Sequence, residues 1–206
     1  MKVAFIGTHG VGKTTLCYEL AALLKKQGLD VEVVMEVARS CPLPINRETS
    51  LKAQLWILHT QIAKELEVEA RHAVTVCDRS VLDNYAYLYH AAGPNAAAER
   101  IVDDWISTYS LLLRVPRTGL PSSDGVRDTD HDFQVAIDER LAELLTRKRV
   151  PYRDLAGVPR NRWINSAVSA VLSVRRGESA ADSATSTGPG SDPSQLTLFT
   201  PNVPRR

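Results

Sequence analysis

Residues 7–14, with the sequence Gly-Thr-His-Gly-Val-Gly-Lys-Thr, combine three glycines with a lysine and a following hydroxyl residue. The stretch fits the pattern GxxxxGK[ST], in which backbone amides turn inward around a phosphate group. A helix that begins near Lys13 would direct its N-terminal dipole at the same anion. Lys13 is expected to reach the β- and γ-phosphates of ATP, Thr14 to ligate Mg²⁺, and Thr15 to face the α-phosphate. The residues predicted to bind the nucleotide are Gly7, Gly10, Val11, Gly12, Lys13, Thr14 and Thr15.

An alternation of apolar runs and amphipathic stretches surrounds this loop. Residues 2–6 form a short apolar run that predicts a buried parallel strand, and residues 13–27 have the periodicity of a helix. Strand, helix and strand in this spacing predict a right-handed βαβ unit, and the whole pattern indicates an α/β fold. Further strands are predicted at 31–35, 73–77, 110–115 and 150–155, and further helices at 49–71, 81–90, 96–106, 133–147 and 160–174.

Three short patterns extend the match beyond the glycine-rich loop. Met-Glu-Val-Ala-Arg at 35–39 ends the second predicted strand, Asp-Arg-Ser at 78–80 ends the third, and Asp-Gly-Val-Arg at 124–127 follows the fourth. Together with the loop, they resemble the P-loop nucleotidases, in particular the small nucleoside and nucleotide kinases. Among these the chain is similar to a group of AAA-labelled ATPases that includes the nicotinamide riboside kinase domain. The resemblance covers about residues 1–174 and implies a P-loop three-layer α/β sandwich with a five-stranded parallel sheet in kinase-like order.

The resemblance also implies roles for the charged residues at the strand ends. In the kinase sheet order the third strand lies beside the first, so Asp78 would reach the Mg²⁺ at Thr14; the alternative is that Asp78 caps the following helix. Arg79 would grip the transferred phosphoryl group or a substrate phosphate, unless it is a surface arginine. Glu36 would accept the proton of the attacking hydroxyl or position it, unless it is a solvated charge. Asp83 is a weaker carboxylate candidate.

The polar stretch at about 117–132 follows the fourth predicted strand and is too long and too charged for a simple turn. Long loops of this kind inside α/β domains are often lids, and the resemblance places a lid here. Arg127 is expected to close over the γ-phosphate and neutralise the charge that develops in the transition state, with Arg117 as the second choice. The aspartates around Arg127 leave an alternative, in which they pair with it or bind an extra cation.

The long helix predicted at 49–71 carries polar and aromatic residues beside its leucines. A glutamine on the corresponding helix of deoxynucleoside kinases reads the base, so the resemblance implies that Gln54 with Trp56 contacts the acceptor. The alternative is ordinary packing. His9 is predicted to shape the loop. Tyr85, Tyr87 and Tyr89 alternate along a predicted helix, so they cannot share one face, and they are predicted to serve packing. The apolar stripe of the long helix is predicted to consist of Leu51, Leu55, Leu58, Ile62 and Leu66.

The overall composition narrows the function classes. Hydrophobic residues are 44% and charged residues 24% of the 206 residues, which is ordinary for a globular domain and argues against wholesale disorder. The net charge of +1 provides no global field for nucleic acid or an anionic membrane, although a local basic groove is compatible with it. No apolar run approaches the roughly 18 residues of a membrane span. Three widely spaced cysteines predict reduced thiols in the cytoplasm.

The composition changes at Gly177, where the predicted kinase-like domain at 1–176 gives way to Ser, Ala, Thr, Gly, Asp and Pro. Residues 177–194 are predicted to be a flexible linker, and residues 195–206 a tail. A short apolar patch in this tail resembles the peptide that binds the bacterial DNA sliding clamp, so a clamp is a candidate partner; the alternative is that the patch docks on its own domain. The matching residues are Gln195, Leu196, Leu198 and Phe199.

These patterns predict an enzyme that uses ATP and Mg²⁺ to phosphorylate a nucleoside, a nucleotide or a related small hydroxyl acceptor. Two alternatives stay open. A clamp-tethered kinase would act on hydroxyl groups of DNA, which the tail favours and the near-neutral charge disfavours. An ATPase switch or recruitment factor in replication or repair would use the nucleotide to control a partner, but no further helical domain follows the predicted core.

Overall fold

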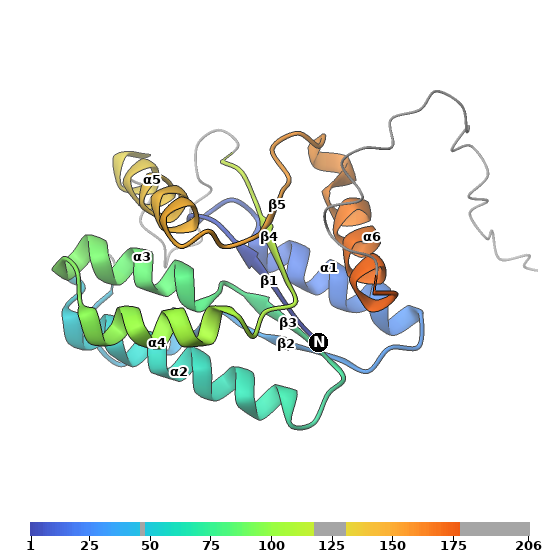
Figure 1. Cartoon of the computed structure of the whole chain (residues 1–206), viewed down its shortest axis with the longest axis horizontal. Coiled ribbons are helices and arrows are strands. Elements are labelled where there is room, and N and C mark those ends of the chain that lie inside the picture. The colour runs from blue at the N-terminus through green and yellow to red at the C-terminus, as the bar shows by residue number, and fades with distance from the viewer. Residues whose placement is uncertain (46–47, 118–130, 178–206) are drawn as a thin grey trace, which may run out of the picture.

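The computed structural model describes residues 1–45, 48–117 and 131–177. In these residues helices and strands alternate along the chain (Figure 1). The strands are β1 (Lys2–Ile6), β2 (Val31–Val34), β3 (Val74–Asp78), β4 (Leu111–Arg114) and β5 (Arg153–Asp154). The helices are α1 (Lys13–Lys26), α2 (Leu51–Glu69), α3 (Val81–Ala92), α4 (Ala96–Ile106), α5 (His131–Arg147) and α6 (Trp163–Arg175), with short 3₁₀ turns at η1 (Val37–Ser40) and η3 (Arg160–Arg162).

The strands form one parallel sheet in the order β2-β3-β1-β4-β5. β1 lies at its centre, with Val3 opposite both Val76 of β3 and Leu111 of β4. The predicted α/β fold with a five-stranded parallel sheet, and with the third strand beside the first, is confirmed. Because the strands run in one direction, the loops after β1, β2, β3 and β4 meet at one edge of the sheet, which is where parallel α/β sheets bind ligands.

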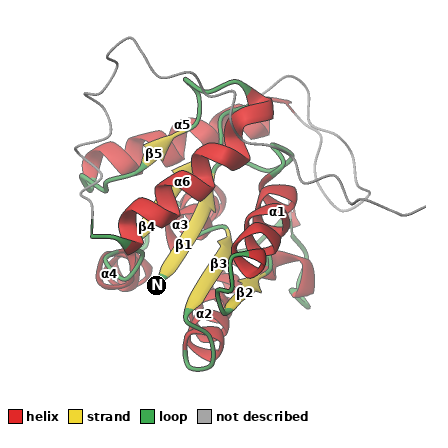
Figure 2. Ribbon diagram, turned by 90° about the vertical axis from the view of Figure 1, so that its right-hand side faces the viewer, coloured by secondary structure: helices red, strands yellow, loops and turns green. Residues whose placement is uncertain are grey.

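Helices cover both faces of the sheet (Figures 1 and 2). On one face α1 and α6 pack against Val3 and Phe5 of β1, and the core on that side includes Trp163. On the other face α2, α3, α4 and α5 pack against Ala4 and Ile6 of the same strand. Successive residues of a strand point to opposite faces, and both faces are covered here. This explains why the strands read as unbroken apolar runs rather than as an alternation.

The buried face of α2 differs from the apolar stripe predicted for it. Leu51 and Leu66 of that stripe are exposed, whereas the polar side chains of Gln54, Gln61 and Glu65 are buried. A buried polar group costs free energy unless it finds hydrogen-bonding partners, so a stripe assigned from apolar residues alone does not include such positions. The other three members of the stripe pack in the core on this face of the sheet, so the prediction was right for them and missed the buried polar residues beside them.

The partners that allow α2 to bury its polar residues come from distant parts of the chain. Lys2 Nζ forms an ion pair with Glu65 (2.9 Å) and a second with Glu69 (3.2 Å). Glu65 also accepts hydrogen bonds from Trp105 Nε1 (2.7 Å) and the Tyr109 hydroxyl (2.6 Å). The Lys2 ammonium lies 4.4 Å and 4.6 Å from the centres of those two aromatic rings. This charge cluster joins β1, α2 and α4 below the sheet.

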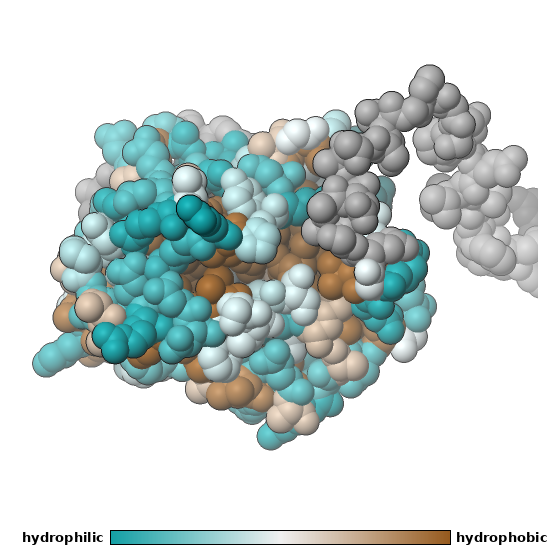
Figure 3. Space-filling view, viewed as in Figure 1, coloured by the Kyte–Doolittle hydropathy of each residue, from teal (hydrophilic) through white to brown (hydrophobic). Residues whose placement is uncertain are grey.

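Other differences from the sequence prediction are confined to element ends. The fifth strand spans only two residues instead of six, and the last helix begins at Trp163 after the η3 turn rather than at residue 160. The face of the molecule in Figure 3 is mostly hydrophilic, with apolar surface gathered between α4 and α6. No helix within residues 1–45, 48–117 and 131–177 is long and apolar enough to cross a membrane.

Candidate active site

The glycine-rich loop leaves β1 at a position that only glycine fits. Gly7 has a φ of 140°, and a Cβ atom there would lie 2.7 Å from the carbonyl oxygen of Val115, just after β4. The Gly7 amide donates a hydrogen bond to Asp83 Oδ1 (2.8 Å) at the start of α3. The beginning of the loop is therefore held between two neighbouring elements.

The end of the loop leads directly into α1. Gly12 precedes the helix with a φ of 96°, and no side chain caps the first turn. Amide groups left open at a helix N-terminus are a general anion-binding feature. Of the other residues predicted to bind the nucleotide, Gly10 has a φ of 74°, Val11 is buried in the core and Thr15 is exposed on the first turn.

Lys13 lies inside this loop rather than at the surface. Its side chain is buried, and Nζ donates a hydrogen bond to the carbonyl oxygen of Thr8 (2.6 Å). Burial, and then the nearby guanidinium of Arg79, lower the pKa of Lys13 to about 8. The nearby carboxylates of Asp78, Asp83 and Glu36 favour the charged form and offset part of this lowering. A phosphate group bound in the loop would add further negative charge and raise the pKa of Lys13.

The two residues predicted to hold Mg²⁺ are in contact. Asp78 lies opposite Phe5 in the pairing of β3 with β1, and Thr14 Oγ1 donates a hydrogen bond to Asp78 Oδ2 (2.5 Å). Asp78 is buried, and its other carboxylate oxygen has no hydrogen-bond partner. A hydroxyl and a carboxylate are oxygen donors of the kind that Mg²⁺ prefers, and Mg²⁺ usually takes few protein ligands. The arrangement therefore fits that ion. The described residues contain no group of three or more His, Cys, Asp or Glu that could hold a metal.

Asp78 is not the cap of the helix that follows it. Ser80 caps α3, with its hydroxyl accepting from the amides of Leu82 and Asp83. Asp83 completes a capping box, because its Oδ2 accepts from the Ser80 amide (2.9 Å). Burial raises the pKa of Asp83, and its carboxylate bonds to backbone amides on two elements. Asp83 thus fixes the loop and the helix start, which leaves Asp78 free of a structural capping role.

A buried ion pair joins the ends of β2 and β3. Arg79 has a φ of 90°, and its Nε and Nη2 both donate to Glu36 Oε1 (2.7 Å each). Arg39 Nε contacts the other carboxylate oxygen of Glu36 (3.2 Å). Glu36 and Arg79 are each less than a tenth exposed, so neither is a solvated surface charge. The guanidinium groups of Arg79 and Arg39 thus both bind the Glu36 carboxylate, which the sequence analysis predicts will contact the acceptor hydroxyl.

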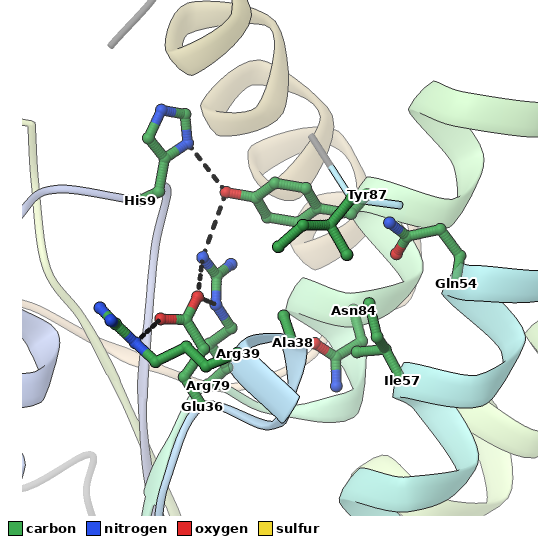
Figure 4. A pocket seen from close by; sticks show the side chains of 10 residues that line it. His9, Glu36, Ala38, Arg39, Gln54, Ile57, Arg79, Asn84 and Tyr87 are labelled. Atoms are coloured by element: carbon green, nitrogen blue, oxygen red, sulfur yellow. Dashed lines mark hydrogen bonds and ion pairs between the residues drawn. The ribbon is translucent and has the colours of Figure 1, made fainter. Parts of the chain in front are cut away.

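Tyr87 on α3 connects this ion pair to the glycine-rich loop (Figure 4). Its hydroxyl accepts a hydrogen bond from Arg79 Nη2 (3.3 Å) and lies 3.0 Å from His9 Nδ1. The packing predicted for Tyr87 is present, in its ring contacts with Phe133 and Arg79, and its hydroxyl also joins this polar network. The spacing of Asp83, Asn84 and Tyr87 could have indicated that Tyr87 faces the site, since residues three and four apart share one face of a helix.

A cavity opens between the strand ends and α2. We call it the strand-end cavity; Figure 4 shows its walls. Three buried polar atoms on its lining residues have no hydrogen-bond partner, namely Gln54 Oε1, Asn84 Nδ2 and Arg79 Nη1. Such atoms are rare in folded proteins and indicate a ligand or water. The lining residues are His9, Glu36, Ala38, Arg39, Ile45, Gln54, Ile57, Arg79, Asn84 and Tyr87.

Gln54 and Trp56 do not act as a pair in this structure. Gln54 lines the strand-end cavity together with Ile57, and its Nε2 donates to Thr49 Oγ1 (2.8 Å). Trp56 is half-buried and is absent from the lining. Residues two apart on a helix point in different directions, whereas residues three apart share a face. Asn84, which the sequence analysis missed, takes the second polar position.

Several predicted residues lie outside the described part of the chain. Arg127 belongs to this group, together with residues 118–130 of the lid predicted at about 117–132. Residues 131 and 132 of that predicted lid begin α5. The tail residues outside the described part are Gln195, Leu196, Leu198 and Phe199. Arg117, the second choice for the lid arginine, is described, and its Nε lies 3.9 Å from Asp138 Oδ2 on α5.

Comparisons with known proteins agree with this geometry. A family model described as "AAA domain" matches residues 2–162. The chain is 25% identical over 116 residues to a probable thymidylate kinase of Thermoplasma volcanium. The match includes 56% of this chain and 61% of that protein, so the chain spans about three fifths of the length of this curated relative.

A solved structure shares the fold. The crystal structure of thymidylate kinase from Ehrlichia chaffeensis superposes with a TM-score of 0.62 and 16% sequence identity. The superposition covers 84% of this chain and 98% of that one. At this identity the likeness establishes the arrangement of the sheet and helices.

Proposed function

The chain belongs to the AAA domain family, and we propose that it is a kinase that transfers the γ-phosphoryl group of ATP, with Mg²⁺, to a small hydroxyl acceptor. The acceptor class is a nucleoside, a nucleotide or a related molecule. One observation carries the proposal: the loop that contains Lys13 and Thr14 adjoins the strand-end cavity, and His9 belongs to both. A nucleotide and a second molecule could thus meet at this edge. Both similar proteins are thymidylate kinases by name, which supports a nucleotide acceptor.

At the nucleotide end, the loop amides, the N-terminus of α1 and Lys13 would hold the β- and γ-phosphates. Thr14 and Asp78 would hold Mg²⁺, supported by their 2.5 Å contact and the unpartnered Asp78 oxygen. The ion supplies neutralisation of phosphate charge when bound. Arg127 would add a positive charge from the lid.

At the acceptor end, the acceptor hydroxyl oxygen would attack the γ-phosphorus while the bond from that phosphorus to the bridging β–γ oxygen breaks, leaving ADP. The proton of the hydroxyl would pass to Glu36. Arg79 and Arg39 hold this carboxylate, so a substrate must compete with them for it. A phosphate on the acceptor could draw Arg79 away, since guanidinium groups bind phosphate bidentately. Positioning would then be the larger part of the role of Glu36, because phosphoryl transfer needs little base catalysis.

The class of acceptor follows from the unpartnered atoms of the strand-end cavity. Gln54 Oε1 is an acceptor, Asn84 Nδ2 is a donor, and Arg79 Nη1 is a charged donor. A planar ring that carries both donors and acceptors, such as a nucleobase, could satisfy the two amides together. Specific ligand sites of this kind place a few polar groups in a mostly apolar cavity.

The decisive test uses γ-labelled ATP and Mg²⁺ with the purified protein. The acceptors are a pool of nucleosides, nucleoside monophosphates, nicotinamide riboside and a DNA oligonucleotide. We expect label on a small molecule, and none when EDTA removes Mg²⁺. Lys13→Ala should lower transfer by about a hundredfold or more, because it removes a charge from the developing transition state. Lys26→Ala, on the exposed end of the same helix, is the matched control.

Two other outcomes would overturn this assignment. Label on the oligonucleotide alone would indicate a kinase that acts on DNA. Release of free phosphate without a labelled product, lost in Lys13→Ala, would indicate an ATPase switch.

We further propose that Gln195, Leu196, Leu198 and Phe199 bind a bacterial DNA sliding clamp. The support is their match to the clamp-binding peptide and a stretch of small and polar residues before it. The full chain should bind purified clamp in a titration, and a Leu198→Ala, Phe199→Ala double variant should bind at least about tenfold more weakly, since such apolar anchors carry most of a peptide's affinity. Equal binding of both proteins would refute this partner.

A further inference from the structure

We propose that Arg160 belongs to the nucleotide site and binds the phosphate tail of the nucleotide from the turn that precedes α6. The inference rests on the proposed function, because it presumes that the glycine-rich loop holds a nucleotide. No sequence pattern singled this residue out. It is separated from the loop by almost the whole described chain.

The first observation is where the guanidinium lies. A Cβ atom placed on Gly12 would be 3.7 Å from Arg160 Nη2. The side chain of Arg160 therefore lies over the last glycine of the loop, beside the first turn of α1. Arg160 is exposed, so its guanidinium can reach a ligand that enters from solvent.

The second observation is that the backbone of this turn is firmly held. Trp163 is buried, and its Nε1 donates a hydrogen bond to the carbonyl oxygen of Val158 (2.7 Å). The Arg162 amide donates to the Pro159 carbonyl oxygen (2.8 Å). Trp163 belongs to the same hydrophobic core as Val11 of the loop. The turn and the phosphate loop are thus parts of one packed unit, so the position of Arg160 over Gly12 is a property of the fold.

The third observation is electrostatic. In the described part of the chain no carboxylate forms an ion pair with Arg160. Its guanidinium carbon lies 5.8 Å from the centre of the Trp163 ring. Two other arginines near the strand ends already form ion pairs, Arg79 with Glu36 and Arg114 with Asp138. Arg160 instead brings its charge beside Gly12, at the positive N-terminal end of α1. This concentration of positive charge is relieved when an anion binds.

The test compares Arg160→Ala with Arg162→Ala, an exposed arginine of the same η3 turn. Binding of MgADP is measured by calorimetry, and binding of Mg-tripolyphosphate by its displacement of a fluorescent ADP analogue. We expect Arg160→Ala to weaken both ligands by about tenfold or more, as loss of a charge-assisted hydrogen bond predicts, while Arg162→Ala stays within about twofold. Arg160→Ala should also make MgADP affinity less sensitive to salt, which a purely structural role would not do.

The outcomes separate this inference from the proposed function. MgADP binding that is lost in Lys13→Ala but unchanged in Arg160→Ala would overturn the role of Arg160 and leave the nucleotide site standing. If Arg160→Ala lowers the affinity for MgADP but not for tripolyphosphate, the inference is also overturned, because Arg160 would then contact the base or the ribose. A wild-type protein that binds neither ligand would overturn both proposals. Thermal unfolding without ligand should be the same for the two variants, which excludes misfolding as the cause.

Discussion

At the scale of single residues, the surroundings of Lys13 make its charged form less favourable than that of an ordinary lysine. Burial and the Arg79 guanidinium disfavour its charged form and lower its pKa to about 8. The loop carbonyl of Thr8 holds the ammonium in place, but a carbonyl does not neutralise it. A triphosphate would, so the protonation of Lys13 and the binding of a nucleotide should be linked.

This linkage predicts a pH dependence. Above pH 8 the free protein has lost the proton on Lys13, and binding must restore it, so MgADP affinity should fall by up to about tenfold per pH unit between pH 8 and 10. Below pH 7 this lysine contributes no pH dependence. Calorimetry at pH 9 in buffers with different ionisation enthalpies counts the proton taken up, and an uptake of zero would contradict the prediction.

The lowered pKa of Lys13 also affects the free energy of unfolding of the protein without a nucleotide. The unfolded chain keeps the ordinary lysine pKa of 10.5, so between pH 8 and 10.5 it binds more protons than the folded chain. The contribution of Lys13 to the free energy of unfolding should therefore rise with pH across that window.

At the scale of elements, the loop after β1 depends on the close approach of β4. The carbonyl oxygen of Val115 lies where a side chain at Gly7 would begin, and the backbone there is also strained for other residues. Gly28, after α1, provides a comparison, because it too has a positive φ (78°) but no heavy atom within 4 Å of an added Cβ.

Gly7→Ala should therefore destabilise the protein more than Gly28→Ala. The backbone cost of about 1–2 kcal/mol applies to both, and the clash with Val115 adds to it only at position 7. Urea unfolding of the two variants measures the difference. Equal losses would show that the β4 carbonyl moves away easily.

The charge cluster of Lys2 and Glu65 is a second feature of element packing. Both side chains are fully buried, and Glu65 bonds to residues of α2 and of the segment around α4. Lys2→Met removes the cation and leaves the carboxylate buried, which should lower the free energy of unfolding by roughly 3–5 kcal/mol. Lys26→Met, at an exposed position, should change it by less than about 0.5 kcal/mol. A small effect of Lys2→Met would mean that hydrogen bonds alone stabilise Glu65.

At the scale of the whole molecule, the described residues before Gly177 form two hydrophobic cores, one on each face of the sheet. Both halves of the candidate site lie at the carboxyl edge of that sheet, on the segments after β1, β2 and β3 and on helices α2 and α3. Folding and nucleotide binding should thus reside in the same part of the chain.

A chain shortened after Gly177 should keep its melting temperature within about 2 °C and its MgADP affinity within about twofold, because the residues removed are mostly small and polar and their composition predicts a linker and tail. Under the proposed clamp role, only clamp binding is lost. Differential scanning calorimetry and the MgADP titration provide the check. A large drop in the melting temperature would show that residues after 177 complete the fold.

What could be predicted from the sequence was local or followed from the order of the elements. The loop at 7–14 is contiguous, so its glycines, Lys13 and Thr14 predict a phosphate site by themselves. Apolar runs and helical periods located each strand and helix to within a few residues, except for the short fifth strand. The contact of Asp78 with Thr14 was expected from the kinase-like strand order and is present in the structure.

Only the tertiary structure decided which polar side chains converge. Gln54, Asn84 and Arg79 come from three elements, and their shared cavity depends on how α2 and α3 are rotated about their axes. The buried polar residues of α2 were missed because Lys2, far away in the sequence, makes a buried Glu65 favourable. Arg160 lies over Gly12 through packing between α1 and α6. The hydrophobic period of a helix or strand depends only on the apolar residues of that element. The positions of the polar side chains of the site depend on contacts with residues from other elements.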